Sequence, residues 1–492
     1  MNKFTCVTLG LLVLGGLQGC LALADTEPQQ PAAIEPSRLQ SLAELDEQAV
    51  TPRALKIQGW KSHSGGKVLF IRTPELPMFD LHVSFPAGSA QDGTHPGLAA
   101  ATFSLLNEGV PGKDLSAIME TLDGLGAKLG MSIEQDRASF SLRSLSATEQ
   151  RDPALLLLTQ ILGQPLLSEE ALVNVKKELT NLLKARQQDP DSQIAHAMNE
   201  LLLPGHPYAQ PIYGTEQSVE LLSREQVQAF HRQAYAGANA VITLVGDLTL
   251  EQAQNMSLQV FNALPVGTEM ASVTPVPRRQ DATASRHIER PLTQTQILLG
   301  QPGVTRQHPD YVALTVAHTI FGGQKVSSRL MTELREKRGL TYAVQLKTAF
   351  LQEGGTAIIR MKTSPQFSDG AVKLVQSMYR DYLQTGPTQQ ELDDTLRQLR
   401  STSVLNSASN SQILSRLVTI NQHDLPLDLD FSLEQAQALT VAQIKEALNR
   451  HFDADQWSVV TLGPTVEQLP LPLPASEVPK SMCRAETGFV AS

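Results

Sequence analysis

The chain has 492 residues, of which 41% are hydrophobic and 18% are charged, and its formal net charge is -10. This length supports several domains with large cores, and the composition is that of a globular protein rather than a disordered one. The negative charge argues against a nucleic-acid partner, because phosphate binding requires a concentrated Lys and Arg surface.

The first residues are typical of an export signal. Lys3 supplies the positive start, residues 7–17 form a short apolar core, and an A-x-A cleavage site ends at Ala24. We therefore expect a signal peptide over residues 1–24 and a periplasmic location. The four residues that end at Cys20 also resemble a bacterial lipoprotein signal. Lipidation of Cys20, which would give an outer-membrane lipoprotein, stays open beside simple cleavage after Ala24.

Regular structure is expected only after a segment rich in Pro, Gln, Glu and Ala, which we interpret as a linker over residues 25–50. Strands are then predicted at 68–71 and at 79–85, and in the second of them apolar and polar residues alternate with period two. Apolar residues at helical spacing predict helices over 96–107 and 115–125.

The following residues predict two more strands, two more helices and a buried strand. The strands are expected at 127–133 and 138–142, and the helices at 155–162 and 169–188. Asp189-Pro190 would end the second helix, because a residue before proline disfavours the helical conformation. The apolar run at 240–247 closes this half of the chain.

The second half repeats the pattern of the first. His308-Pro309-Asp310 precedes a helical segment as His95-Pro96-Gly97 does, and residues 452–463 are similar to residues 235–246. A strand and helix pattern that is used twice predicts an α+β fold of two similar lobes from an internal duplication. The expected boundaries are an N-terminal lobe at 51–270, a linker at 271–290, a C-terminal lobe at 291–475 and a tail at 476–492.

Residues 97–109 and 334–342 carry a family resemblance. The first run resembles the zinc helix of the pitrilysin/insulysin metallopeptidases, the inverzincins, and the second resembles that family's substrate-binding Arg/Tyr element. Residues 55–475 as a whole are similar to the short bacterial members of this family and to the subunits of mitochondrial processing peptidase. Further supporting segments, in the family's order, are Phe85-Pro86-Ala87-Gly88-Ser89, Gly205-His206-Pro207-Tyr208, Gly214, Val245-Gly246-Asp247 and Ser328-Arg329-Leu330.

The resemblance implies a two-lobed clamshell around a chamber for an unfolded peptide, with each lobe an antiparallel-rich sheet covered by helices. It also implies an H-x-x-E-H helix, but the two His positions and the Glu position are Ala100, Ser104 and Phe103. Ala100 offers no lone pair, a serine hydroxyl is a poor zinc ligand, and Phe103 cannot accept a proton. We therefore expect no metal and no complete catalytic site in this chain. Glu178 is the candidate remnant of the family's third ligand, although a lone Glu on a helix is usually a solvated residue.

The Arg/Tyr element is intact, in contrast to the zinc helix, which has lost its three functional residues. In the family, an Arg seven residues before a Tyr reaches across the chamber with it and stabilises the developing oxyanion, which assigns Arg335 and Tyr342 to substrate binding. Guanidinium and phenol groups both donate the hydrogen bonds that this role needs. Arg338 remains an alternative to Arg335.

The loss of one element and the retention of the other predict a zinc-free, substrate-binding subunit of an exported heterodimeric metallopeptidase. Such a chain would be inactive alone and would act on peptides together with a homologous partner that carries zinc on an intact H-x-x-E-H helix. Two alternatives stay open. One is a non-enzymatic periplasmic protein that captures peptides through an exposed sheet edge, and the other is a structural protein of the envelope.

Overall fold

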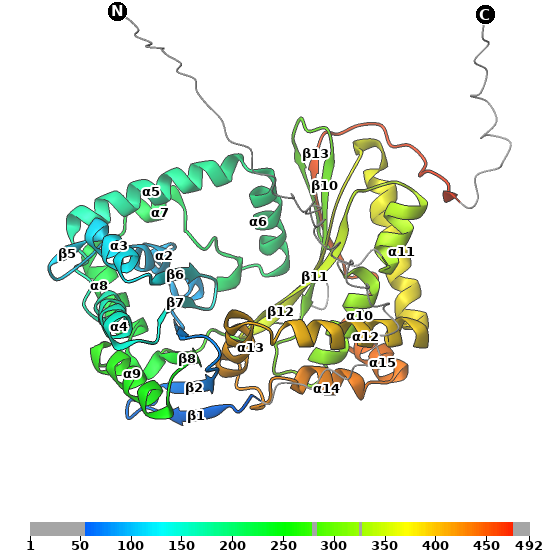
Figure 1. Cartoon of the computed structure of the whole chain (residues 1–492). Coiled ribbons are helices and arrows are strands. Elements are labelled where there is room, and N and C mark those ends of the chain that lie inside the picture. The colour runs from blue at the N-terminus through cyan, green and yellow to red at the C-terminus, as the bar shows by residue number, and fades with distance from the viewer. Residues whose placement is uncertain (1–54, 278–282, 324–326, 476–492) are drawn as a thin grey trace, which may run out of the picture. The chain divides into compact units, whose positions relative to one another are not determined.

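The computed structural model of the chain describes residues 55–277, 283–323 and 327–475 (Figure 1). The signal peptide and linker expected before residue 51, Cys20 among them, and the tail expected over 476–492 lie outside these ranges. The described residues belong to one compact unit. Among their helices, none combines the length and the apolar character that a membrane span requires.

The described part of the first half contains one large sheet, a two-stranded ribbon and eight α-helices. Its elements are β1 Gln58–Lys61, β2 Lys67–Arg72, β3 Met78–Phe85, α2 Leu98–Leu105, β4 Gly109–Val110, β5 Lys113–Asp114, α3 Leu115–Gly124, β6 Lys128–Ile133, β7 Ala138–Leu145, α4 Thr148–Gly163, α5 Glu169–Gln188, α6 Pro190–Leu202, α7 Glu216–Glu220, α8 Arg224–Ala234, β8 Val241–Gly246 and α9 Leu250–Ala263.

The second half repeats this order with its own sheet. Its elements are β9 Ser285–Glu289, β10 Thr295–Gly303, α10 Tyr311–Gly322, the π-helical turn Met331–Lys337, β11 Val344–Leu351, β12 Gly354–Thr363, α11 Ser368–Thr385, α12 Gln389–Leu405, α13 Asn410–Gln422, α14 Phe431–Gln437, α15 Val441–His451 and β13 Ser458–Gly463.

The strand orders of the two sheets match and confirm the predicted α+β fold with two similar lobes. The first sheet has the order β1-β2-β8-β3-β7-β6, and the second has the order β11-β12-β10-β13-β9. When the second order is read backwards, it corresponds to the first without β1. In both sheets one pair is parallel, β2 with β8 and β9 with β13, and the other pairs are antiparallel.

Each half lends a helix to the sheet of the other half. Helix α13 packs on the first sheet, where Leu417 joins a buried cluster with Ile71, and the Asn421 side-chain amide donates to the carbonyl of Ile242 at 2.7 Å. Helix α6 packs on β10 and β13, where Met198 joins a buried cluster with Leu298. In Figure 1, α6 and α11 lie on opposite sides of the second sheet. Neither half therefore completes its packing without the other.

Strand β9 lies inside the segment 271–290, for which the sequence predicts a linker. Its residues are Ser, Arg, His, Ile and Glu, and only the isoleucine is apolar, so no alternation signals a strand. Parallel pairing with β13 defines it instead. Helix α6 is similarly hidden in the sequence, because Asp189-Pro190 ends α5 and at the same time begins α6, with Asp189 as its N-cap.

Candidate substrate-binding site

A buried carboxylate fixes the start of helix α2. Gly97 precedes the helix with φ of 90°, and its N–H donates to Asp92 at 2.7 Å, as the N–H of Ala99 does at the same distance. Burial raises the pKa of Asp92 to about 7, although these two backbone bonds oppose the rise. The carboxylate thus satisfies two N–H groups that a helix start leaves without partners.

The three degenerate zinc-site positions on α2 have become part of the packing of the first half. Ala100 is completely buried. Phe103 is half-buried against the main core, and its ring centroid lies 5.4 Å from that of Phe140. Ser104 is half-buried as well. An aromatic ring of this kind contributes packing that a catalytic carboxylate at the same position does not.

A pocket of about 370 Å³ lies beside these positions and brings Phe103 and Ser104 together with Glu178 of α5. Strand β6 and Tyr213 complete its lining. Burial raises the pKa of Glu108, and the nearby charge of Glu178 raises it further. Structural zinc needs four His, Cys or carboxylate ligands, and a catalytic site needs three. A lining whose polar side chains are two serines, a tyrosine and one glutamate does not fit zinc.

The Arg335 and Tyr342 side chains both point into solvent. Tyr342 is 84% exposed, and Arg335 is exposed at the end of the π-helical turn. After the turn, the N–H of Leu340 donates to the carbonyl of Leu334 at 2.8 Å and closes the C-terminal end of the turn. Among the described residues, no hydrogen bond or ion pair of either side chain is recorded. Turns of this kind are frequent at functional sites.

Arg338, the alternative to Arg335, is held by the fold. Its Nε lies 3.0 Å from a carboxylate oxygen of Glu333, and its Nη1 donates to the carbonyl of Pro472 at 2.8 Å. Only 18% of its side chain is exposed. The geometry thus favours Arg335 as the arginine that can turn to a ligand.

Tyr342 lines a second pocket, of about 450 Å³, on one face of β11 and β12. Lys347, Arg360 and Lys362 are part of the same lining. This pocket differs from the pocket beside α2, so the structure does not bring the Arg/Tyr element together with the degenerate zinc positions. These basic residues were not predicted from the sequence, although Arg360 and Lys362 alternate with apolar residues along β12.

A third pocket, of about 740 Å³, lies between α5, α6 and the second sheet. Arg360 lines it as well as the second pocket, so the two are neighbours. Further arginines in its lining are Arg186, Arg286 and Arg290. No motif marks these residues in the sequence, because they lie on segments that only the fold brings together.

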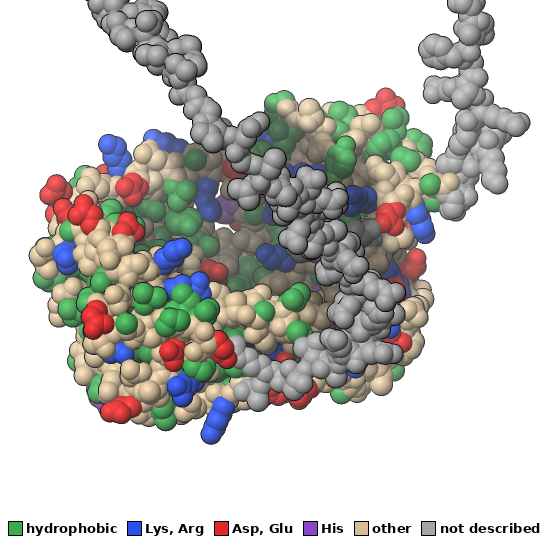
Figure 2. Space-filling model, viewed as in Figure 1, with side chains coloured by type: hydrophobic (Ala, Val, Ile, Leu, Met, Phe, Trp, Pro, Cys, Tyr) green, Lys and Arg blue, Asp and Glu red, His purple; other side chains and the backbone are tan. Residues whose placement is uncertain are grey.

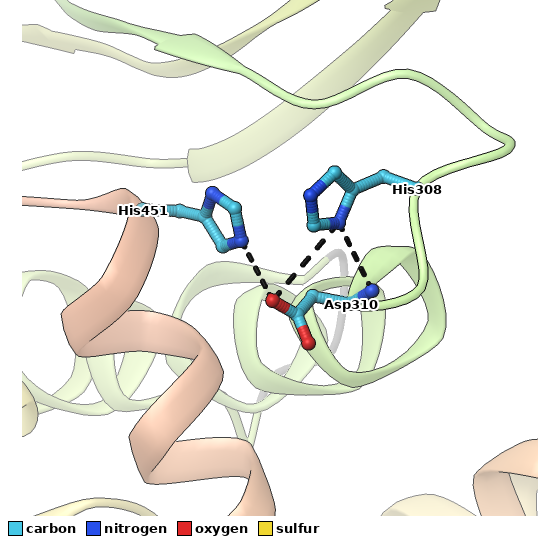
Figure 3. Close-up of side chains that lie close together, drawn as sticks. All are labelled: His308, Asp310 and His451. Atoms are coloured by element: carbon cyan, nitrogen blue, oxygen red, sulfur yellow. Dashed lines mark hydrogen bonds and ion pairs between the residues drawn. The ribbon is translucent and has the colours of Figure 1, made fainter.

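Two histidines and an aspartate form a cluster at the start of α10 and the end of α15 (Figure 3). The Nε2 atom of His451 lies 2.7 Å from Oδ2 of Asp310, and Arg450 pairs with this same oxygen. Nδ1 of His308 accepts the backbone N–H of Asp310 at 3.1 Å. Burial raises the pKa of Asp310, but the bonds from Arg450 and His451 outweigh it and hold the pKa below its usual range. With a guanidinium on its carboxylate, the cluster fits a link between two helices better than a cation site.

Comparisons with known proteins give consistent results. A family model described as the peptidase M16 inactive domain matches residues 221–399, which include the Arg/Tyr element. The non-peptidase homolog YmxG of Helicobacter pylori is 26% identical over 393 residues, which are 78% of this chain and 89% of that protein. An uncharacterized zinc protease of Mycobacterium tuberculosis is 24% identical over 437 residues, 86% of this chain and 96% of that protein.

A solved structure extends the likeness to the whole described fold. The crystal structure of a peptidase M16 inactive domain from Pseudomonas fluorescens is 42% identical and superposes with a TM-score of 0.81. The match covers 85% of this chain and 100% of that one. The similar proteins thus include both chains named as zinc proteases and chains named as inactive or non-peptidase.

Proposed function

The chain belongs to the peptidase M16 family, and we propose that it is the zinc-free, substrate-binding subunit of an exported heterodimeric zinc metallopeptidase. The partner is a homologous chain with an intact H-x-x-E-H helix, which supplies the zinc and the base. One contrast carries this proposal. The motif positions of α2 are packed with Ala100 and Phe103, whereas Arg335 and Tyr342 remain exposed.

The role of this chain is to hold a peptide backbone. The phenol of Tyr342 and the guanidinium of Arg335 donate hydrogen bonds, and peptide carbonyl oxygens accept them. A donor aimed at a developing oxyanion is worth about 2.7–4 kcal/mol of transition-state stabilisation. Arg338 stays in its bonds to Glu333 and to the backbone, where it supports the turn that carries Arg335.

Export to the periplasm is part of the same proposal. It is supported by the basic start, the apolar core and the A-x-A site of residues 1–24. A periplasmic peptidase subunit would meet unfolded or partly degraded chains, which are the peptides that an open sheet face can hold.

The test begins with co-purification of this chain from the native envelope, and the partner is then assayed alone and in the mixture. We expect peptide hydrolysis only in the mixture. Tyr342→Phe should lower kcat about 100-fold, because it removes one donor and keeps the ring. Arg335→Gln should act in the same direction, whereas Arg400→Gln, an exposed arginine of α12, is the matched control. Full activity of the partner alone would refute the composite site.

A second candidate is a non-enzymatic peptide-binding protein. It is favoured by β6, which is the last strand of the first sheet and lines the pocket beside α2, so that a peptide strand can pair with it. This candidate predicts peptide binding by the lone chain that is indifferent to Tyr342→Phe. The same two variants therefore separate the candidates.

A further inference from the structure

We propose that the peptide held by this chain is acidic, and that its carboxylates are bound by a basic wall on the second sheet and on the segments that face it. This inference rests on the proposed peptide-binding function and names its substrate class. The basic wall consists of Arg186, Arg286, Arg290, Lys347, Arg360 and Lys362.

The charge of this wall is opposite to the charge of the chain. The pocket beside Tyr342 has three cationic side chains and no acidic one in its lining. The neighbouring large pocket adds three more arginines, and its only acidic lining residues are Asp189 and Asp191. The whole chain carries a net charge of -10, so a basic surface of this extent is local and selects anionic ligands.

Strand geometry places the cations of the second sheet on one face. Gln345 lies opposite Arg360, and Lys347 lies opposite Ile358 in the antiparallel register of β11 and β12. The residues between them, such as Ile359, are buried in the core of the second half. Because side chains alternate along a strand, the cations stand together on the face that the core leaves open. Figure 2 shows Lys and Arg side chains around the hollow in the viewed face.

Two cations of this wall already bind a carboxylate of the chain itself. Asp191, in the first turn of α6, has its Oδ1 atom 3.3 Å from the Lys362 ammonium and 3.7 Å from the Arg360 guanidinium. A single carboxylate is thus shared by two cations. An acidic side chain of a bound peptide would be received by the same kind of contact.

Two arginines of the wall also have a carboxylate nearby, since Arg286 pairs with Glu200 at 2.8 Å and the charge of Arg186 acts on Asp189, whereas Arg290 and Lys347 make no ion pair with a described residue. The Arg290 Nε atom donates to the amide oxygen of Gln193 at 3.0 Å, and the guanidinium of Arg186 stacks on Tyr213 at 4.8 Å from the ring centroid. For Lys347, no ion pair with a described residue is recorded, and its side chain is exposed. The wall therefore retains positive charge for a ligand after its internal pairs are made.

Tyr342 lies in the same pocket as Lys347 and Arg360. The group proposed to hold the peptide backbone and the groups proposed to hold its acidic side chains therefore serve one ligand. A guanidinium and an ammonium of this kind are strong donors to carboxylates.

The experiment uses two fluorescein-labelled peptides of equal length, one with glutamates alternating with apolar residues and one with glutamines in their place. Anisotropy titrations of the purified full chain at low ionic strength should show the glutamate peptide binding about tenfold more tightly, which corresponds to two or three surface ion pairs. Added salt should reduce this preference.

Variants locate the effect. Lys347→Gln should weaken binding of the glutamate peptide about two- to fivefold and leave the glutamine peptide unchanged. The double variant with Arg360→Gln should remove most of the preference, and Asp191→Asn should increase it by releasing two cations. Lys373→Gln, an exposed lysine on α11, removes the same charge elsewhere and should change nothing.

Three results would overturn the inference, and they are distinguishable. If both peptides bind equally, the acidic preference is wrong and the peptide-binding function stands. If the preference survives Lys347→Gln with Arg360→Gln, the wall is not its origin. If neither peptide binds to the chain, alone or with its partner, the proposed function fails and the inference fails with it.

Discussion

Phe103→Glu restores the residue type that an active H-x-x-E-H helix carries at this position, and we expect it to destabilise the chain without creating a site. Truncating a fully buried Phe to Ala costs about 3–5 kcal/mol. Phe103 is only half-buried against Phe140, so we expect its ring to contribute about 2 kcal/mol to the free energy of unfolding. The new carboxylate would also share a pocket with Glu178, which adds about 1 kcal/mol of repulsion. The expected loss is about 3 kcal/mol.

Urea unfolding at neutral pH measures this loss directly as a change in the free energy of unfolding. Phe103→Leu is the matched control, because it keeps an apolar side chain and should cost only about 1 kcal/mol. Zinc affinity of both variants is read by competition with a chromophoric chelator, and neither should bind. A free energy of unfolding of Phe103→Glu within about 0.5 kcal/mol of that of the unchanged chain would show that the ring is not part of the packing.

Two further predictions follow from the electrostatics. Burial raises the pKa of Asp92 from 3.8 to about 7. Between pH 4 and pH 7 the native state therefore binds more protons than the unfolded state does. The free energy of unfolding should consequently fall, by at most about 4 kcal/mol, as the pH rises from 4 to 7. Asp92→Asn should lack this slope, and urea midpoints measured from pH 4 to pH 8 check it; parallel curves for the two proteins would contradict it. Arg338→Gln should lower the free energy of unfolding by about 1–2 kcal/mol, because it breaks the bonds to Glu333 and to a carbonyl, whereas Arg335→Gln should leave it unchanged. Thermal unfolding of both variants tests this, and equal losses would show that Arg335 is also structural.

Much of the fold was predictable because local patterns and the internal repeat agree. Strand β3 alternates clearly, and α5 spans residues 169–188, where a helix ended by Asp189-Pro190 was predicted. Strand β9 was not predictable, since four of its five residues are polar and its partner strand β13 is distant in the sequence. The exchange of α6 and α13 between the halves could not be predicted either, because the apolar face of a helix does not identify the sheet against which it packs.

The candidate site was predictable only where a motif carries it. Residues 97–109 and 334–342 identify two elements by spacing, but they do not say that the elements line different pockets. The basic wall has no motif, since Arg186, Arg286 and Arg360 come from three distant segments. Spacing does not distinguish Arg335 from Arg338 as the substrate-binding residue. The hydrogen bond from Arg338 to Glu333, which favours Arg335, is visible only in the structure.

The decisive experiment measures zinc content and peptidase activity together, on the purified lone chain and on the partner that co-purifies with it. We expect no tightly bound zinc and no turnover in the lone chain, with zinc in the partner and hydrolysis only in the mixture. One tightly held zinc ion per chain, together with turnover by the lone chain that chelators stop, would contradict this expectation.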